Sequence, residues 1–471
     1  MHLALIVQLS IALVAGEFAR RGAGMPAWSG ALALAAGPLW SIGRGWFVVR
    51  ATFREMDRGI DGSARFDRFH ARAPWVATAA MLVAVWSGLP ASLAAIGGKP
   101  LVVATFALAG ISATLLCYAH AWSIDRRLRE SATIRMLDAS RPLHALPGRG
   151  AYVFARARAG LLPMLAPLLV PLLASELARM VALRVAPEHA ASAQIGGALA
   201  GAILLFALVP VLVPAILGLR RLEPGELRDD LESLARDAGL GVREIWVWPT
   251  EGLVANAAVM GLLPGLRCVM LSDCLLECMP RAQVRAVMAH ELGHVRRHHL
   301  PWMTGVIIGC WTIAGVLAAL AAESALPYLP PPDASAASPD LPLEALAFVR
   351  DAAALAGGLW LFGFASRRFE RQADTFAVQL LSTCEGSAVA TDGAVEAMRG
   401  ALASVAFLNH VPAERPSWRH GSIAWRREYL AGIAGRPLDR MAIDRLVALI
   451  AVALTLVGVA GIALSALLPA A

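Results

Sequence analysis

The residues of this chain best suited to chemistry lie in the string HELGH, residues 290–294. His290 and His294 are four residues apart, so on a helix they share one face and both imidazoles can reach one metal ion. Glu291 lies beside them, where its carboxylate can polarise a water molecule held by that metal. This combination is typical of zinc sites that hydrolyse peptide bonds. Such strings also occur by chance, and the alternatives are a helix with surface histidines or a degenerate site that no longer binds metal.

The residues around this motif predict one helix from Pro280 to His299, with apolar residues at helical spacing and proline at the tolerated first position. His298 continues the metal-binding face but is eight residues from His290. At ~1.5 Å per residue the two lie roughly 12 Å apart along the axis, too far to share one ion. The metzincin pattern requires Gly and His where this chain has Arg297 and Leu300, so that class is excluded.

A zinc ion in a hydrolase usually has three protein ligands and one open position. The downstream string SRRFERQAD, residues 366–374, offers a third ligand because Glu370 and Asp374 lie one helical turn apart. Glu370 can bind the metal while Asp374 accepts a hydrogen bond from a ligand histidine and fixes the orientation of its ring. The alternative interpretation of these residues is the solvated, charged face of a helix.

The pair HELGH and SRRFERQAD resembles the integral-membrane zinc metallopeptidases, a family that includes the CAAX prenyl endopeptidase and the HtpX-type proteases. In that family, zinc is held by both histidines of HExxH and by the glutamate of a downstream RxxExxAD. The resemblance therefore implies one Zn2+ per chain, bound by His290, His294 and Glu370. It also implies that Glu291 is the catalytic base.

Two further strings strengthen this resemblance. NAAVMG, residues 256–261, is similar to the family's NAxxxG strand. HGSIAWRREYL, residues 420–430, is similar to its HPSxxxR segment, with Arg426 at the position of the family's arginine and Gly421 in place of its proline. The four motifs occur in the family's order, and the resemblance covers about residues 222–430.

The same two strings imply how substrate is held. By the resemblance, His420 stabilises the oxyanion, and Arg426 positions His420 or contacts substrate. An edge strand containing Asn256, Ala257 and Ala258 would pair with an extended peptide through backbone hydrogen bonds. The plainer interpretations are a surface imidazole for His420 and a residue at the entry of a turn for Asn256.

The composition predicts a membrane protein. The chain has 471 residues, of which 58% are hydrophobic and only 16% are charged, and its mean hydropathy is +0.60. A soluble domain has nearer a quarter of charged residues. A helix needs about 20 apolar residues to cross a bilayer. We expect about nine spans, at residues 3–19, 27–49, 75–96, 101–122, 160–178, 194–218, 301–322, 346–365 and 443–468.

We therefore expect an α-helical polytopic membrane protein with a small α+β, zincin-like catalytic domain between its transmembrane helices. In the soluble part, the sequence pattern predicts a helix at 225–239 and strands at 242–248, 254–261 and 267–273. The span at 160–178, broken by three prolines, and the charged span at 346–365 could be re-entrant or line a cavity. The expected parts are an N-terminal transmembrane region (1–221), the catalytic domain (222–300), a transmembrane hairpin (301–365), a second catalytic segment (366–440) and a C-terminal transmembrane helix (441–471).

The distribution of basic residues predicts the orientation. With nine spans, the arginine-rich connections 50–72 and 126–158 fall on the same side as both catalytic segments, whereas residues 303–349 contain no lysine or arginine. The basic side of a membrane protein faces the cytoplasm. We expect an integral protein of the bacterial inner membrane, retained by an uncleaved first span, with a cytoplasmic site. Arginines at 20–21 argue against this orientation.

The net charge of +7 is explained by arginines that face anionic lipid headgroups, so we expect a bilayer and no nucleic acid as partner.

The sequence favours a membrane zinc endopeptidase that cleaves membrane-associated or unfolded proteins through a zinc-activated water. A sensor–transducer of the β-lactam-receptor type would need an extracytoplasmic ligand-binding domain, and we expect none because Ala471 directly follows the last span. A non-catalytic scaffold predicts lost catalytic residues, and the core set is complete. The cleaved protein and the oligomeric state stay open.

Overall fold

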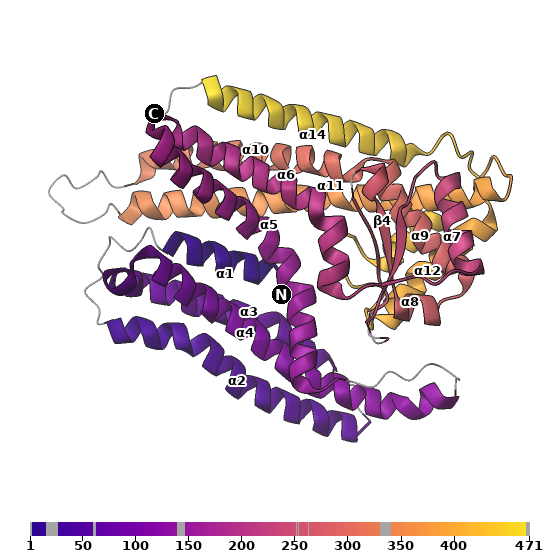
Figure 1. Cartoon of the computed structure of the whole chain (residues 1–471), viewed down its shortest axis with the longest axis horizontal. Coiled ribbons are helices and arrows are strands. Elements are labelled where there is room, and N and C mark those ends of the chain that lie inside the picture. Colours follow the sequence, from indigo (N-terminus) through magenta and orange to yellow (C-terminus); the bar gives the residue numbers. More distant parts are fainter. Residues whose placement is uncertain are drawn as a thin grey trace. The chain divides into compact units, whose positions relative to one another are not determined.

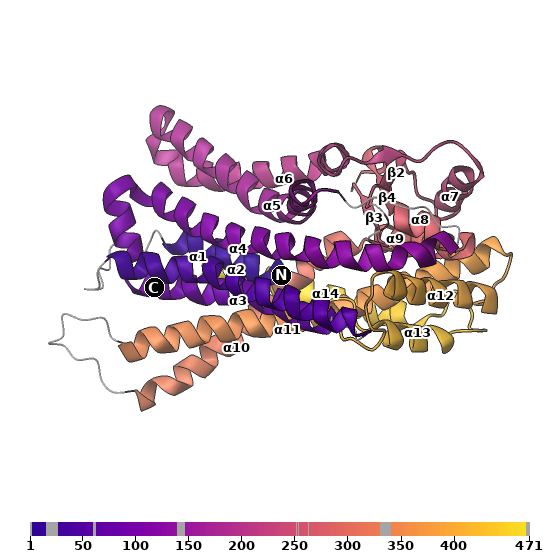
Figure 2. The ribbon, with the colours of Figure 1, turned by 90° about the horizontal axis from the view of Figure 1, so that it is seen from below.

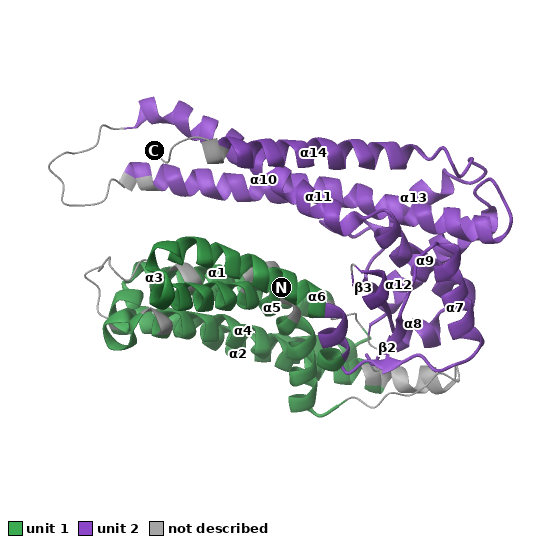
Figure 3. Cartoon of the chain, turned by 45° about the horizontal axis from the view of Figure 1, so that its top comes forward, with its two compact units in different colours: residues 1–208, 215–217 green, residues 209–214, 218–471 purple. Residues whose placement is uncertain are grey.

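The computed structural model describes residues 2–15, 27–59, 63–138, 147–250, 252, 254–261, 263–329 and 341–467. The chain folds into two compact units, which Figure 3 shows in different colours. Unit 1 comprises residues 1–208 and 215–217, and unit 2 comprises residues 209–214 and 218–471. The division falls within one long apolar helix, and every candidate site residue belongs to unit 2.

Unit 1 consists of long apolar helices (Figure 1). Met81, Val102 and Phe106 are buried where these helices pack together. Large apolar side chains such as Trp28 and Ile96 are exposed on the outer faces, as suits contact with lipid. The helices are α1 (His2–Ala15), α2 (Ala27–Asp57), α3 (Ser63–Trp86), α4 (Leu89–Asp138), α5 (Arg149–Val185) and α6 (Ala190–Leu217), with the short helix η2 (Pro187–His189) before α6.

The chain is an integral membrane protein by the length and apolarity of its helices. In the described part of the chain, seven helices are long and apolar enough to cross a membrane, or eight when one bent pair counts as a span. The predicted count of nine is therefore not confirmed. The difference is the span predicted at 3–19, because α1 has only 14 residues and residues 16–19 lie outside those that the structure describes.

Two predicted spans have unexpected shapes: the span at 75–96, expected to be continuous, is bent, whereas the span at 160–178, expected to be broken, is continuous. The first is bent by 75° between α3 and the start of α4, where Gly88 adopts a φ of +82° and Pro90 lies in the first turn of the new helix. The second lies inside α5, which is continuous through its three prolines. The broken span is thus the one that contains a glycine with non-helical backbone dihedral angles, and the span with three prolines stays helical.

Unit 2 contains a four-stranded sheet with the order β1-β2-β4-β3. The parallel pair β2–β4 lies at its centre, and β1 and β3 join as antiparallel edge strands. Figure 2 shows the sheet beside α7 and α8. The strands are β1 (Arg220–Arg221), β2 (Glu244–Trp248), β3 (Ala257–Met260) and β4 (Cys268–Ser272), and η3 (Pro264–Leu266) lies between β3 and β4. The helices are α7 (Glu226–Asp237), α8 (Asp273–Cys278), α9 (Arg281–Arg296), α12 (Asp392–Leu408) and α13 (Ile423–Ala431).

Three long helices complete unit 2: α10 (His299–Ala325), α11 (Leu341–Cys384) and α14 (Ala442–Leu467), with η4 (Leu326–Tyr328) after α10. Figure 1 shows α10, α11 and α14 lying along one another. Helices α10 and α14 approach so closely that a Cβ at Gly309 would overlap the carbonyl group of Leu454. Small residues let membrane helices pack at such distances.

Two predicted domain boundaries differ from the structure. The sheet begins with β1 at Arg220, so the soluble part starts before residue 222. The predicted hairpin (301–365) and second catalytic segment (366–440) share one element, because α11 runs through residues 365 and 366 as one 44-residue helix. A single buried apolar cluster, including Leu271, Met288, Phe369 and Val447, joins the sheet, α9, α11 and α14. The membrane helices and the soluble part of unit 2 therefore share one core.

Candidate metal centre

The two histidines of HELGH lie on α9 and project together. The Nε2 atoms of His290 and His294 are 3.2 Å apart, and only 8% of His290 is exposed. Helix α9 has this position because Val284, Met288 and Leu292 are buried in the core of unit 2. Burial lowers the pKa of His294 to about 3, so its imidazole is neutral, which is the form that binds a metal.

Glu370 on α11 completes the cluster. Its carboxylate oxygens lie 3.7 Å from Nε2 of His290 and 3.9 Å from Nε2 of His294. One ligand atom from each of the three residues lies within 4.8 Å of the others. Two imidazole nitrogens and one carboxylate oxygen are the donor set of a catalytic zinc site with an open fourth position. The residues present therefore fit a zinc ion.

Gly293 explains how ligands on two separate helices come together. It lies between the two histidines on the side of α9 that faces α11. A Cβ at this position would lie 3.0 Å from the ring of Phe376 and 3.2 Å from the carbonyl oxygen of Ala373. The glycine of HELGH thus allows α9 and α11 to cross closely enough for one ion to reach both.

Asp374 and Arg426 lie behind the cluster. Oδ1 of Asp374, which is fully buried, is 2.9 Å from Nδ1 of His290, the contact expected of a carboxylate that orients a ligand ring. Arg426 on α13 donates to both oxygens of Asp374, at 2.7 and 2.6 Å, and lies 3.3 Å from Glu370. Burial lowers the pKa of Arg426, but the adjacent Asp374 carboxylate outweighs burial and raises it, so the guanidinium stays charged.

The expected role of Arg426 changes accordingly. Its sequence position implied that it positions His420 or contacts substrate. Its side chain is 7% exposed and its described ion pairs go to Asp374 and Glu370. An arginine that is buried against two carboxylates offsets their repulsion and holds them in one geometry.

His420 lies beside the same carboxylate. Its Nδ1 is 2.9 Å from Oε1 of Glu370, and 52% of its side chain is exposed. The following Gly421 has a φ of +74° and its N–H donates to the carbonyl of Ser417. Proline can adopt neither this φ nor this hydrogen bond. The glycine that departs from the family's pattern is therefore the residue that the local backbone requires.

Glu291 lies between the metal ligands and the edge strand β3. Burial raises the pKa of its carboxyl to about 7, and a hydrogen bond from the backbone of Val259 acts in the opposite direction. A base is most effective when its pKa is near the working pH. The environment of Glu291 therefore suits a group that takes up and releases a proton.

The strand β3 forms an edge of the sheet, but its backbone is not free where the sequence implied. The carbonyl of Asn256 accepts from the N–H of Ser272, and antiparallel pairs alternate, so Ala258 also directs its backbone groups toward β4. The outward amides belong to Ala257, which donates to the Asn256 side chain, and to Val259. Of the three residues expected to bind substrate, only Ala257 therefore presents its backbone at the edge.

The two histidines that follow the motif, His298 and His299, lie where the sequence did not predict. Helix α9 ends at Arg296, and His298, expected to continue its face, is exposed in a left-handed conformation with a φ of +53°. This break turns the chain so that His299 starts α10 and points inward, 1% exposed. Its Nδ1 lies 2.8 Å from Nδ1 of His294. The sequence offered no periodicity that distinguishes these adjacent histidines, so His299 was missed.

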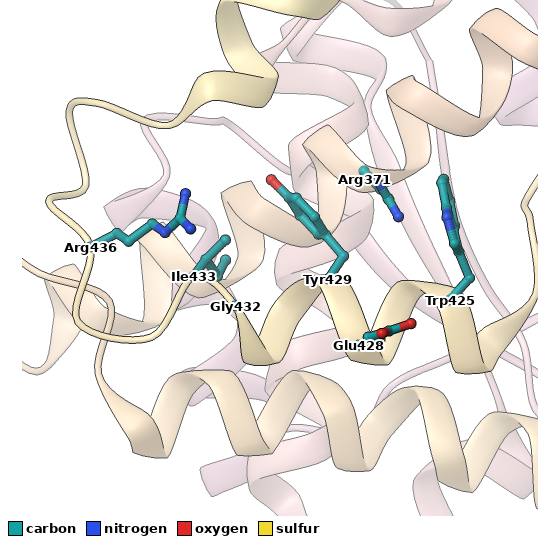
Figure 4. Close-up of a pocket in the computed structure, with 7 residues that line it drawn as sticks. All are labelled: Arg371, Trp425, Glu428, Tyr429, Gly432, Ile433 and Arg436. Carbon is teal, nitrogen blue, oxygen red and sulfur yellow. The ribbon is translucent and has the colours of Figure 1, made fainter.

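A separate cavity of about 340 Å3 lies on the face formed by α11 and α13 (Figure 4). The guanidinium carbon of Arg371 lies 3.3 Å from the ring centroid of Trp425 and 4.6 Å from that of Tyr429. None of the metal-ligand residues lines this cavity. It is therefore not the metal centre, although Arg371 directly follows Glu370 in sequence.

The fold and the site define a membrane protein in which two histidines and one glutamate could hold a metal ion, and part of the chain matches a known family. Residues 221–410 match the sequence model of peptidase family M48. The matched residues include HELGH, Glu370 and Asp374.

Relatives that match by sequence include HtpX proteases. Protease HtpX of Chromohalobacter salexigens is 41% identical over 69 residues, which are 15% of this chain and 22% of that protein. A Protease HtpX homolog of Pyrococcus abyssi is 35% identical over 74 residues, 16% of this chain and 25% of that protein. Protease HtpX of Pseudomonas fluorescens is 39% identical over 69 residues, 15% and 23% of the two chains. This chain thus spans about a quarter of the length of these relatives.

A solved structure, the crystal structure of S. mikatae Ste24p, aligns with 84% of this chain and 98% of its own chain. The sequence identity is 16% and the TM-score is 0.37.

Proposed function

We propose that this protein is a membrane zinc endopeptidase. The observation that carries the proposal is the convergence of His290 and His294 from α9 with Glu370 from α11, next to the proton-accepting Glu291. When bound there, zinc would supply a Lewis acid that lowers the pKa of a water molecule and polarises a carbonyl. The match of residues 221–410 to peptidase family M48 supports the same function.

The proton transfers are assigned to the residues that the chain supplies. Glu291 takes a proton from the attacking water as its oxygen bonds to the scissile carbonyl carbon. It then delivers that proton to the amide nitrogen as the carbon–nitrogen bond breaks, giving a carboxylic acid and an amine, and the acid then passes its remaining proton to the amine or to solvent. His420, which is half exposed, would donate a hydrogen bond to the oxyanion from the ring nitrogen that does not face Glu370.

The substrate class follows from where the site is attached. Glu370 lies on α11, whose residues 345–384 are one of the helices able to cross a membrane. A site on this helix is held at the surface of the bilayer. We infer that its substrates are membrane proteins or unfolded chains at that surface, and that an extended segment pairs with the outward amide of Ala257 on β3.

The orientation is inferred from charge. We propose that the arginine-rich connections and the catalytic segments face the cytoplasm of a bacterial cell, and that the protein lies in the inner membrane of that cell.

One experiment tests the function directly. The protein is purified in detergent, its zinc content is measured, and casein cleavage is followed with and without a chelator. We expect one zinc per chain and cleavage that the chelator abolishes and added zinc restores. Full zinc content without cleavage of any protein substrate would favour a non-catalytic scaffold, and an absence of zinc from the purified protein would contradict the metal assignment.

A further inference from the structure

His294 has a second nitrogen that the metal does not use. Its Nε2 faces the metal cluster, while its Nδ1 lies 2.8 Å from Nδ1 of His299. Nε2 of His299 lies 2.9 Å from Oε1 of Gln372, and Nε2 of that amide donates to Oδ1 of Asp444 at 2.8 Å. His299 and Gln372 are 1% and 6% exposed, so these groups depend on one another for hydrogen bonds.

The contacts are consistent with a single direction of donation. A histidine that binds metal through Nε2 carries its proton on Nδ1, so His294 donates to Nδ1 of His299. His299 then carries its own proton on Nε2 and donates it to the oxygen of Gln372. The amide nitrogen of Gln372 in turn donates to Asp444. Each member accepts from one neighbour and donates to the next, and the chain ends on a carboxylate.

Asp444 is itself fixed by other elements. Its Oδ2 lies 3.0 Å from Nη2 of Arg297, which caps the end of the metal-binding helix, and 3.5 Å from the amide nitrogen of Gln379 on α11. Asp444 lies in the first turn of α14, where the helix dipole stabilises a negative charge. Helix α14 is in turn packed closely against α10 near Gly309. The end of the chain of hydrogen bonds is therefore anchored in the membrane helices.

The two histidine ligands differ in how they reach a carboxylate. His290 contacts the buried Asp374 directly, at 2.9 Å. His294 has Gln372 and His299 between its ring and Asp444, and each of the three supporting groups comes from a different long helix: α10, α11 and α14.

We propose that His299, Gln372 and Asp444 form a relay that positions the ring of His294 and thereby sets the affinity of the site for zinc. These are positioning residues, since they act through His294. The inference rests on the proposed function, because it takes zinc as the ligand. Through Asp444, the C-terminal membrane helix α14 becomes part of the support of the metal centre.

The test uses the full chain in detergent. Zinc affinity is measured by competition with a chromophoric chelator in His299→Phe, Gln372→Leu and Asp444→Asn, together with the unfolding temperature of each metal-free protein. His299→Phe retains a ring for the edge-on contacts with His294 and Phe369, whose centroids both lie 4.8 Å from that of His299, while it removes both nitrogens. Asp444→Asn is the mildest change, since it keeps the size and an acceptor for Gln372.

Loss of such supporting hydrogen bonds typically weakens metal binding about 10–100-fold. We expect this range for His299→Phe and Gln372→Leu, and a smaller loss for Asp444→Asn. The visible absorption of the Co2+-substituted protein should also change in His299→Phe, because the ligand geometry changes. The matched controls are His298→Asn, at an exposed neighbour where asparagine tolerates the left-handed backbone, and Asp439→Asn, at a carboxylate that is 76% exposed. Both should bind zinc like the parent.

The outcomes separate the two proposals. A parent protein that binds no zinc contradicts the proposed function. If the parent binds zinc, but folded His299→Phe or Gln372→Leu protein binds it within twofold of the parent, the relay is contradicted. Lower unfolding temperatures with unchanged zinc affinity would likewise assign these residues to helix packing alone. If the two larger changes prevent folding, Asp444→Asn decides, because unchanged affinity and an unchanged cobalt spectrum in that variant overturn the proposal.

Discussion

Glu291 and Glu370 are carboxylates of one cluster whose surroundings give them different roles. Glu370 lies 3.3 Å from the guanidinium of Arg426 and 2.9 Å from His420, contacts that favour a permanent anion and hence a metal ligand. Glu291 has no such described ion pair, and burial raises its pKa to about 7. Both residues are glutamates, so the difference between a metal ligand and a base comes from their surroundings.

Glu291→Gln tests the role of the base. The amide is nearly the same size but cannot take a proton from water, so we expect cleavage to fall by about 10²–10⁴-fold. Zinc content should match that of the parent. The measurement is casein turnover alongside elemental analysis of the same preparation. Turnover within a few-fold of the parent would show that another group is the base.

Glu370→Ala tests the third ligand. Its removal leaves two histidines for the metal, and we expect zinc to be lost at low free metal while the membrane helices stay folded. Elemental analysis after dialysis against a weak chelator measures this loss. Glu385→Ala, an exposed glutamate just after α11, should keep its zinc. Full occupancy in Glu370→Ala would remove Glu370 from the ligand set.

At the scale of elements, the edge strand β3 and the helix α11 connect the site to its substrate. The outward N–H of Ala257 is satisfied only locally, by the Asn256 side chain, so an incoming peptide can take its place. The N–H of Ala258 belongs to the ladder with β4, by the alternation of antiparallel pairs. Substitutions at these adjacent alanines should therefore have different effects.

We expect Ala257→Pro to lower kcat/KM up to about tenfold, the value of one backbone hydrogen bond, without loss of zinc. Proline is tolerated at an edge strand when its nitrogen faces outward. Ala258→Pro is the control, because it removes a ladder bond and should instead lower the unfolding temperature. Kinetics and thermal unfolding of both variants check this. A parental kcat/KM in Ala257→Pro would contradict the docking of substrate on β3.

At the scale of the whole molecule, the cytoplasmic orientation is the testable property. Cysteines are introduced by Glu226→Cys, in the soluble part of unit 2, and by Tyr328→Cys, at the far end of α10, in a background without the exposed Cys384. In intact bacterial cells, a membrane-impermeant maleimide should label Tyr328→Cys and leave Glu226→Cys unlabelled. After the membrane is permeabilised, both should react. Labelling of Glu226→Cys in intact cells would reverse the assigned orientation.

The sequence by itself determined the parts of this protein that depend on local spacing and composition. HELGH on an amphipathic run predicts α9, and the ligand pair follows from a helical period of 3.6 residues. The strands β2, β3 and β4 and the apolar helices follow from hydrophobic patterning in the same way, because each pattern reports which face of a single element is buried. The chemistry of the two histidines predicts zinc and the downstream SRRFERQAD offers Glu370 as the third ligand, and the resemblance implies the same ligand set.

Only the tertiary structure decided what depends on contacts between distant segments. Which of the adjacent His298 and His299 faces the site depends on a left-handed residue at the end of α9, a backbone choice that periodicity does not encode. Arg426 binds Asp374 rather than His420 because α13 packs beside α11. Asp444, which is far from His294 in the sequence, accepts from Gln372 because α14 packs beside α11. Local sequence patterns fix the faces of elements, whereas the pairing of those faces depends on the packing of the whole unit.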